Sequence, residues 1–265
     1  MQNILKTALN KASYNGKAAK TILHLLYLLF IIFSIYKIIN EPNIYGKICY
    51  SIIIIIIALA IYYAESLKKD YAKAIKQLTM EANPNKANET FKKLIKKEKG
   101  SKAYKNSYIL FLTLYYLDEE EYQKCITHCL ANAKFLKNSI DNLFVYHFSL
   151  FFSYYKLNNY EEAKDEYRKL SRLKGTKKLS PLYNWELIEG IYQMIRKEYK
   201  QAYNTFKTVN TANMNKREKI QFYVQFAECC SKLKDEEKAN NYYQLIAKEE
   251  GNSKTLCHAK ELVSK

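Results

Sequence analysis

The stretch that decides the fold, residues 22–63, reads ILHLLYLLFIIFSIYKIINEPNIYGKICYSIIIIIIALAIYY. It contains two apolar segments, residues 22–39 and 48–63, and a polar link between them. A helix needs about 20 apolar residues, with a lower limit near 17, to cross the hydrocarbon core of a bilayer. Pro42 and Gly46 in the link favour a turn. Residues 21–64 are therefore predicted to form a transmembrane hairpin of two antiparallel helices.

The second segment is slightly short, but Tyr62 and Tyr63 suit the headgroup region at its end. Two other structures are compatible with apolar segments of this kind. Buried core helices of a soluble protein rarely lack charges over two such runs. A cleaved signal peptide would use the sequence at residues 58–60, which lies beyond the first 30 or so residues where such signals end. Both alternatives fit less well than the hairpin.

The orientation of the hairpin follows from its flanking lysines, because short cytoplasmic segments are enriched in Lys and Arg. Four lysines precede the first segment and four follow the second: Lys6, Lys11, Lys17, Lys20, Lys68, Lys69, Lys73 and Lys76. We expect a multi-pass protein of the cell membrane, of the bacterial inner-membrane type, with both termini cytoplasmic.

Composition bounds the rest of the chain. It has 265 residues, a net charge of +17 and a pI near 9.4, and this length suits one globular domain plus an anchor. Only three prolines and six glycines are present, which favours helices over a turn-rich β fold. The abundance of Lys, Asn, Ile and Tyr also fits the coding bias of an AT-rich genome, so part of the basicity need not be functional.

Two basic segments flank the hairpin. Residues 1–20 form a cytoplasmic segment with helical spacing of apolar residues, either an amphipathic helix on the inner leaflet or a tail with a targeting charge. Residues 65–82 are expected to be a basic juxtamembrane helix, and residues 65–105 hold twelve lysines against five acids. We expect Lys68, Lys69, Lys73 and Lys76 to contact anionic lipid, at about 1 kcal/mol for each well-placed lysine. A solvated helix face is the alternative.

An internal repeat follows. Small residues recur at intervals of 38, 38, 39 and 37, namely Ala87, Cys125, Ala163, Ala202 and Ala239. Four residues after each stands a bulky or apolar one: Phe91, Cys129, Tyr167, Phe206 and Tyr243. Upstream lie further amphipathic runs, at residues 108–117, 145–157, 185–195 and 221–233, with short polar links between the two parts. The unit is therefore a helix, a tight turn and a second helix.

The pattern resembles the tetratricopeptide repeat family. Gly190 and Ala227 fill the small position of the first helix in two repeats, and residues 157–163, LNNYEEA, match the second helix. The period exceeds the 34 residues of the family, and the customary proline after the second helix is missing. The resemblance covers about residues 83–250 and implies that residues 83–265 form a degenerate helical-repeat domain, an α-solenoid.

The resemblance also implies a concave groove lined by the first helices. The residues at the matching positions are Leu110, Leu114, Phe148, Phe152, Leu187, Ile191, Val224 and Glu228. The set is mostly apolar, and core positions are the alternative interpretation. The Lys/Asn clamp by which some members of the family hold a peptide carboxylate has no counterpart here.

The sequence gives less support for metal binding, catalysis or nucleic-acid binding. Cys125-x-x-His128-Cys129 lacks a second Cys/His pair at zinc spacing, and the repeat explains both cysteines as core. The isolated histidines and the lack of phosphate-loop, HExxH and GxSxG motifs argue against an enzyme, so no catalytic residue, metal or cofactor is expected. Nucleic-acid binding suits the charge, but the lysines of the repeats alternate with acids.

The sequence thus predicts a membrane-anchored scaffold or adaptor that binds a protein partner at the cytoplasmic face. The alternative is a regulator whose groove senses a peptide. The identity of the partner does not follow from the sequence.

Overall fold

The computed structural model describes residues 29–98, 103–176 and 182–263. The expected amphipathic segment at residues 1–20 and the start of the first apolar segment lie outside these residues. Helices are the only regular elements in the described part of the chain, which confirms the all-α prediction. After the helix Leu29–Asn40 they are α2 (Ile44–Thr79), α3 (Pro84–Lys97), α4 (Ala103–Asp118), α5 (Tyr122–Ala131), α6 (Ala133–Leu136), α7 (Ile140–Lys156), α8 (Tyr160–Ser171), α9 (Trp185–Ile195), α10 (Tyr199–Lys207), α11 (Lys216–Lys232), α12 (Glu236–Ala247) and α13 (Lys254–Val263).

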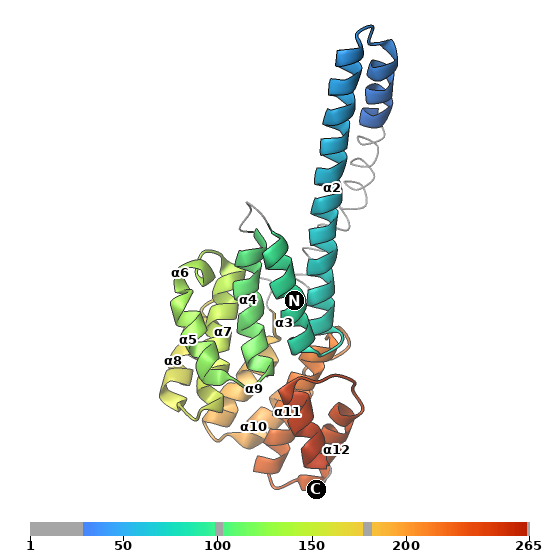
Figure 1. Ribbon diagram of the computed structural model, residues 1–265. Coiled ribbons are helices and arrows are strands. Elements are labelled where there is room, and N and C mark those ends of the chain that lie inside the picture. The colour runs from blue at the N-terminus through green and yellow to red at the C-terminus, as the bar shows by residue number, and fades with distance from the viewer. Residues whose placement is uncertain (1–28, 99–102, 177–181, 264–265) are drawn as a thin grey trace. The chain divides into compact units, whose positions relative to one another are not determined.

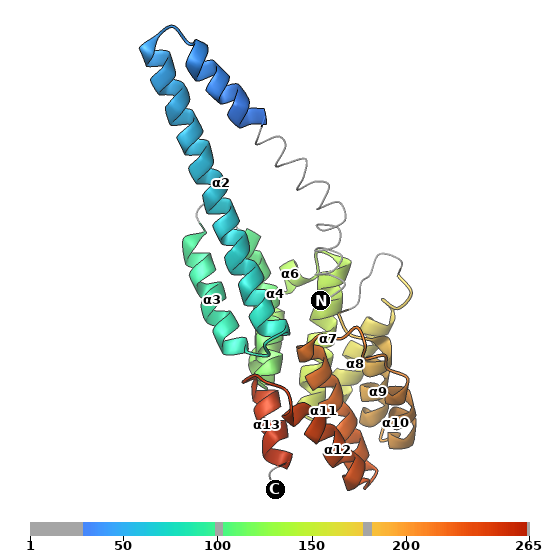
Figure 2. The ribbon, with the colours of Figure 1, turned by 90° about the vertical axis from the view of Figure 1, so that its right-hand side faces the viewer.

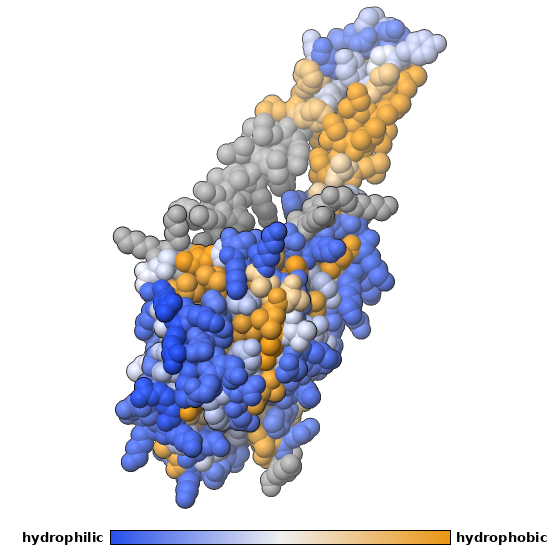
Figure 3. Space-filling model, turned by 90° about the vertical axis from the view of Figure 1, so that its left-hand side faces the viewer, coloured by the Kyte–Doolittle hydropathy of each residue, from blue (hydrophilic) through white to orange (hydrophobic). Residues whose placement is uncertain are grey.

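The chain divides into two compact units between Asp70 and Tyr71. The first unit is the hairpin of Leu29–Asn40 and the start of α2, joined by a link in which Asn43 accepts a hydrogen bond from the Tyr45 amide at 3.0 Å. Figure 3 shows the apolar surface of this hairpin. In α2, an 18-residue window of high hydropathy has no buried residue.

By length and composition, α2 is long and apolar enough to cross a membrane. Leu29–Asn40 is a shorter apolar helix, and residues 22–28 of the predicted first segment lie outside the described part. The described residues therefore contain one candidate span, and the second span of the expected hairpin stays a prediction.

The second unit contains the described residues from Tyr71 onward, and the boundary of the repeat domain at residue 83 stays a prediction. The expected juxtamembrane helix is the last part of α2, and its apolar face packs into this unit. Tyr71 contacts the Phe91 ring edge-on at 5.6 Å, and Gln77 accepts a hydrogen bond from Thr90 at 2.8 Å. The end of α2 and α3 thus form the first helix pair of the array (Figures 1 and 2).

The turns inside the helix pairs share a residue with positive φ, and four of the five also share one hydrogen-bond pattern. The non-glycine residues with positive φ in the described chain are Ala82, Glu120, Asn158, Lys197 and Lys234. Each stands five residues before one of the aligned small residues. After Glu120, the Glu121 amide donates to the Tyr116 carbonyl at 2.9 Å, and equivalent bonds close the three later turns. This is the six-to-one bond of a Schellman motif, which ends a helix and reverses the chain.

The small residues are the points of closest packing. All five of them are fully or almost fully buried. Gly190 is needed for the same reason, because a Cβ there would lie 2.3 Å from the Phe206 ring. The helix pairs stack on one another in chain order, from α3 to α13.

The array closes on itself at its ends. The amides of Asn252 and Ser253, just before α13, both donate to the Ala82 carbonyl at 3.0 Å. Ala82 also belongs to an apolar cluster with residues of the last helices: Ile220, Val224, Ile246, Leu256 and Ala259. The first turn of the array is therefore part of the core of its last helix pair.

Candidate functional site

The closure of the array decides where the expected groove residues lie. Leu110 and Glu228 are half-buried, and the other six are buried: Leu114, Phe148, Phe152, Leu187, Ile191 and Val224. Phe148 stacks on the Tyr183 ring at 3.9 Å between centroids, and Phe152 contacts the Tyr122 ring. These six side chains are therefore packed among core residues, and the expected groove stays a prediction.

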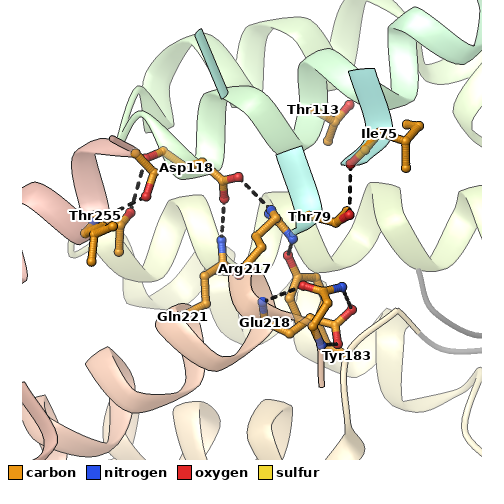
Figure 4. A network of polar contacts seen from close by, with 12 residues as sticks. Ile75, Thr79, Thr113, Asp118, Tyr183, Arg217, Glu218, Gln221 and Thr255 are labelled. Carbon is orange, nitrogen blue, oxygen red and sulfur yellow. Dashed lines mark hydrogen bonds and ion pairs between the residues drawn. The ribbon is translucent and has the colours of Figure 1, made fainter. Parts of the chain in front are cut away.

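A buried polar network stands at the centre of the closed array (Figure 4). Asp118, the last residue of α4, accepts hydrogen bonds from Arg217 at 2.6 Å and from Gln221 at 2.9 Å, both on α11. Arg217 also donates to the Tyr183 hydroxyl at 2.7 Å, and Thr255 of α13 donates to the Asp118 carbonyl at 3.2 Å. One carboxylate thereby joins segments about a hundred residues apart in the chain.

The charges of this network are held by one another. The side chains of Arg217 and Asp118 are each only 4% exposed. Burial lowers the pKa of Arg217, but Asp118 and Tyr183 more than offset it, so that the pKa lies above its usual value. The guanidinium therefore stays protonated. Burial raises the pKa of Asp118 above its usual value, and the Arg217 charge and the hydrogen bonds from Arg217 and Gln221 oppose this rise. The contact between the two side chains fixes the geometry of the closure.

A pocket of about 330 Å³ opens beside this network. Its lining comes from the α4–α5 turn and from α5, α7, α11, α12 and α13: Glu120, Tyr122, Lys156, Val224, Glu228, Tyr243, Thr255, His258, Ala259 and Leu262. The volume is in the range of small ligand sites. Two of the expected groove residues, Val224 and Glu228, therefore do lie together, with partners that the sequence did not indicate.

Lys156 and Glu228 form the polar centre of the pocket. Lys156 Nζ lies 2.5 Å from Glu228 Oε1, and the Tyr155 hydroxyl donates to the same carboxylate at 3.4 Å. In the amide orientation that its neighbours require, Gln225 donates to Glu228 and accepts from Lys156. The Lys156 ammonium also lies over the Phe152 ring, 5.6 Å from its centroid. These contacts hold both charged groups in place.

The phenols of the pocket stay protonated at neutral pH. Burial raises the pKa of Tyr122, and the nearby carboxylates of Glu120 and Glu228 raise it further. Burial raises the pKa of Tyr243 to about 12. The pocket thus offers hydroxyl donors, two carboxylates and one ammonium within a partly apolar wall. Such a set can hold a polar group of a peptide or a small molecule in one orientation.

The four lysines expected at the lipid surface lie on α2. All four are exposed, and Lys68 pairs with Glu65 at 2.7 Å. Lys69, Lys73 and Lys76 follow the i, i+4, i+7 spacing of one helix face, opposite the face that carries the buried Ala74 and Leu78. The amphipathic pattern therefore keeps these lysines outside the core.

The cysteine pair of α5 is buried. Cys125 Sγ lies 3.6 Å from the Thr113 carbonyl, and the hydrogen bond with the Cys125 thiol, together with burial, raises the pKa of Cys129. No cluster of His, Cys, Asp and Glu that could hold a metal ion occurs among the described residues. The positions are those of core residues.

No protein-family model, curated protein or solved structure matches this chain. By its own geometry, the described part of the chain is an all-helical array of helix–turn–helix units that follows an apolar hairpin.

Proposed function

We propose that this protein is a membrane-anchored helical-repeat scaffold that binds a protein partner at the cytoplasmic face. One observation carries the proposal: α2 has an apolar window with no buried residue at one end and a packed face at the other. Tyr71 contacts Phe91 and Tyr104, so the last turns of α2 are part of the array. A single helix then serves as anchor and as first element of the repeat domain.

The repeat class is proposed from the turns and the packing. Left-handed residues recur five positions before each small residue, and this periodicity is what an array of equivalent helix pairs requires. A degenerate member of the tetratricopeptide repeat family, or a fold close to it, is consistent with this. Proteins built in this way commonly present extended surfaces to other proteins, which supports a scaffold.

The exposed lysines support attachment to the inner leaflet. Lys69, Lys73 and Lys76 share one face of α2, and Lys92, Lys93, Lys96 and Lys97 are exposed on α3. Anionic lipid attracts such lysines by about 1 kcal/mol each, within a Debye length of about 8 Å at physiological salt.

Topology mapping tests the proposal. Reporter fusions at residues 20, 43 and 70 should give cytoplasmic, external and cytoplasmic signals, because lysines flank the outer ends of the hairpin. The chain should also stay with membranes during alkaline extraction. An external signal at residue 70, or release into the supernatant, contradicts the anchored topology.

A peptide-sensing regulator is the second candidate, and the pocket at Lys156 and Glu228 favours it. A ligand that binds the folded state raises its apparent stability, by about 2.7 kcal/mol at a hundredfold excess over Kd. Candidate peptides should therefore raise the melting temperature of the full chain in detergent. Lys156→Met should abolish the increase, whereas Lys164→Met, on α8 and outside the lining of the pocket, should keep it. Equal responses of the two variants would exclude this pocket as the sensor.

A further inference from the structure

The segment that leads into α13 is tied to the turn that follows α2. Ala82, in the turn between α2 and α3, has a φ of +47° and accepts both backbone bonds that hold Asn252 and Ser253. Gly251, just before them, has a φ of +145°. A Cβ at Gly251 would lie 2.8 Å from the Ala82 carbonyl oxygen and 2.9 Å from that of Glu81. This contact therefore requires glycine for its backbone conformation and for its close approach.

Helix α13 forms one wall of the pocket. Thr255, His258, Ala259 and Leu262 all lie on it, and they face a wall that includes Lys156 and Glu228. Figure 2 shows α13 beside α11 and α12, at the C-terminal end of the described chain. Without α13, the polar centre of the pocket would be open to solvent.

The attachment of α13 is slight for an element that closes a pocket. The helix has ten residues, of which Thr255, Leu256 and Ala259 are buried. These three residues make its contacts with the core, through the Thr255 bond to the Asp118 carbonyl and the apolar cluster around Ala82. His258 is exposed and stands 3.7 Å from the Glu120 carboxylate, the outer limit of an ion pair. Elements with few buried apolar contacts open locally at a lower free energy than the whole fold.

We propose that residues 251–263 form a displaceable gate over the Lys156–Glu228 pocket, and that the Ala82 carbonyl couples this gate to the end of α2. A shift of the α2–α3 turn breaks the two backbone bonds, releases α13 and opens the pocket to a peptide partner. The inference rests on the proposed function for its trigger, which is a movement of α2 in the membrane. The opening of the gate itself can be measured whether or not α2 spans a bilayer.

Hydrogen exchange of the full chain in detergent tests the gate. In the native protein, the amides of α13 should exchange at least tenfold faster than those in the middle of α11. Gly251→Ala should accelerate the exchange of α13 at least tenfold more and leave α7 and α9 unchanged. Gly175→Ala is the matched control, because Gly175 has a φ of +83° but nothing within 4 Å of an added Cβ. Gly175→Ala should leave the hydrogen exchange of α13 unchanged.

Three results would overturn the gate: equal protection of α13 and α11, equal effects of the two alanine variants on α13, or a Gly251→Ala protein that exchanges faster throughout. A second measurement uses a labelled peptide of residues 251–263 with the native sequence. It should bind the Gly251→Ala protein at least tenfold more tightly than the Gly175→Ala protein, because only the first has released its own gate. Equal affinities for the two proteins would also reject the proposal.

Discussion

At the scale of single residues, the turns explain most of the repeat. A left-handed backbone is costly for residues other than glycine, by about 1–2 kcal/mol, and asparagine tolerates it best. This chain nevertheless places alanine, glutamate, asparagine and lysine at the five turn positions. At four of these positions the six-to-one hydrogen bond and the packing of the helix pair impose the conformation against local preference. At Ala82 the Asn83 amide donates to the Gln77 carbonyl instead, at 2.9 Å.

Glycine at these turns should therefore stabilise the protein. We expect Lys197→Gly and Lys234→Gly each to raise the free energy of unfolding by about 1 kcal/mol, and Asn158→Gly to raise it less. Lys93→Gly, in the middle of α3, should lower it by about 1 kcal/mol. Urea unfolding of the full chain in detergent measures these changes. A loss of stability in both turn variants would mean that these turns do not hold left-handed residues.

The buried contacts of the Glu166 carboxylate should make the stability of the array sensitive to acid. Its carboxylate lies 2.6 Å from His147 Nδ1 and 2.6 Å from Lys169 Nζ. Burial raises the pKa of Glu166, but these hydrogen bonds outweigh it, and the net shift is downward. A carboxylate whose pKa is lower in the folded state stabilises the fold at pH values above its unfolded pKa, which is about 4.3 for glutamate. This contribution is lost as the pH falls through the lower pKa of the folded state.

The free energy of unfolding should accordingly fall on acidification below about pH 5. Glu166→Gln should reduce stability at neutral pH and flatten this dependence. Glu162→Gln, on the exposed face of the same helix, should keep the native profile. Chemical unfolding at a series of pH values makes the comparison, and identical profiles for native protein and Glu166→Gln would contradict it.

At the scale of helices, the register of the second helix of each pair is the decisive feature. Ala163 and Ala202 are fully buried, whereas Glu162, the neighbour of Ala163, is exposed. The helical period thus places one small residue per pair against its partner helix, which lets the two backbones approach each other closely.

Overpacking should reveal this register. Ala163→Leu or Ala202→Leu adds three carbons to a close contact and should cost about 1–3 kcal/mol. Glu162→Leu should change the free energy of unfolding by no more than about 0.5 kcal/mol, because its side chain points to solvent. Thermal melts of the three variants compare their stabilities with that of the native protein. Neutral alanine variants with a damaging Glu162→Leu would show that the register is wrong.

At the scale of the whole molecule, the Asp118–Arg217 pair closes the array. Removal of one partner leaves a buried charge without its counter-charge, which typically costs about 3–5 kcal/mol, whereas apolar replacement of both partners costs much less. We expect Arg217→Met to lower the free energy of unfolding by about 3–5 kcal/mol. The double variant Asp118→Leu/Arg217→Met should recover most of this loss. Additive losses in a double-mutant cycle would show that the two residues do not interact.

The sequence by itself determined the all-helical fold, the apolar character of residues 22–63 and the repeat of small residues, since each follows from a local period of apolar side chains. The tertiary structure alone decided that α13 returns to Ala82 and that Asp118 meets Arg217. It thereby buried most of the expected groove residues and formed the pocket at Lys156 and Glu228. The contacts at Ala82 and Asp118 join residues about a hundred or more positions apart. Helical periodicity specifies which face of a helix is buried, but small rotations at every successive pair decide which distant helix it meets.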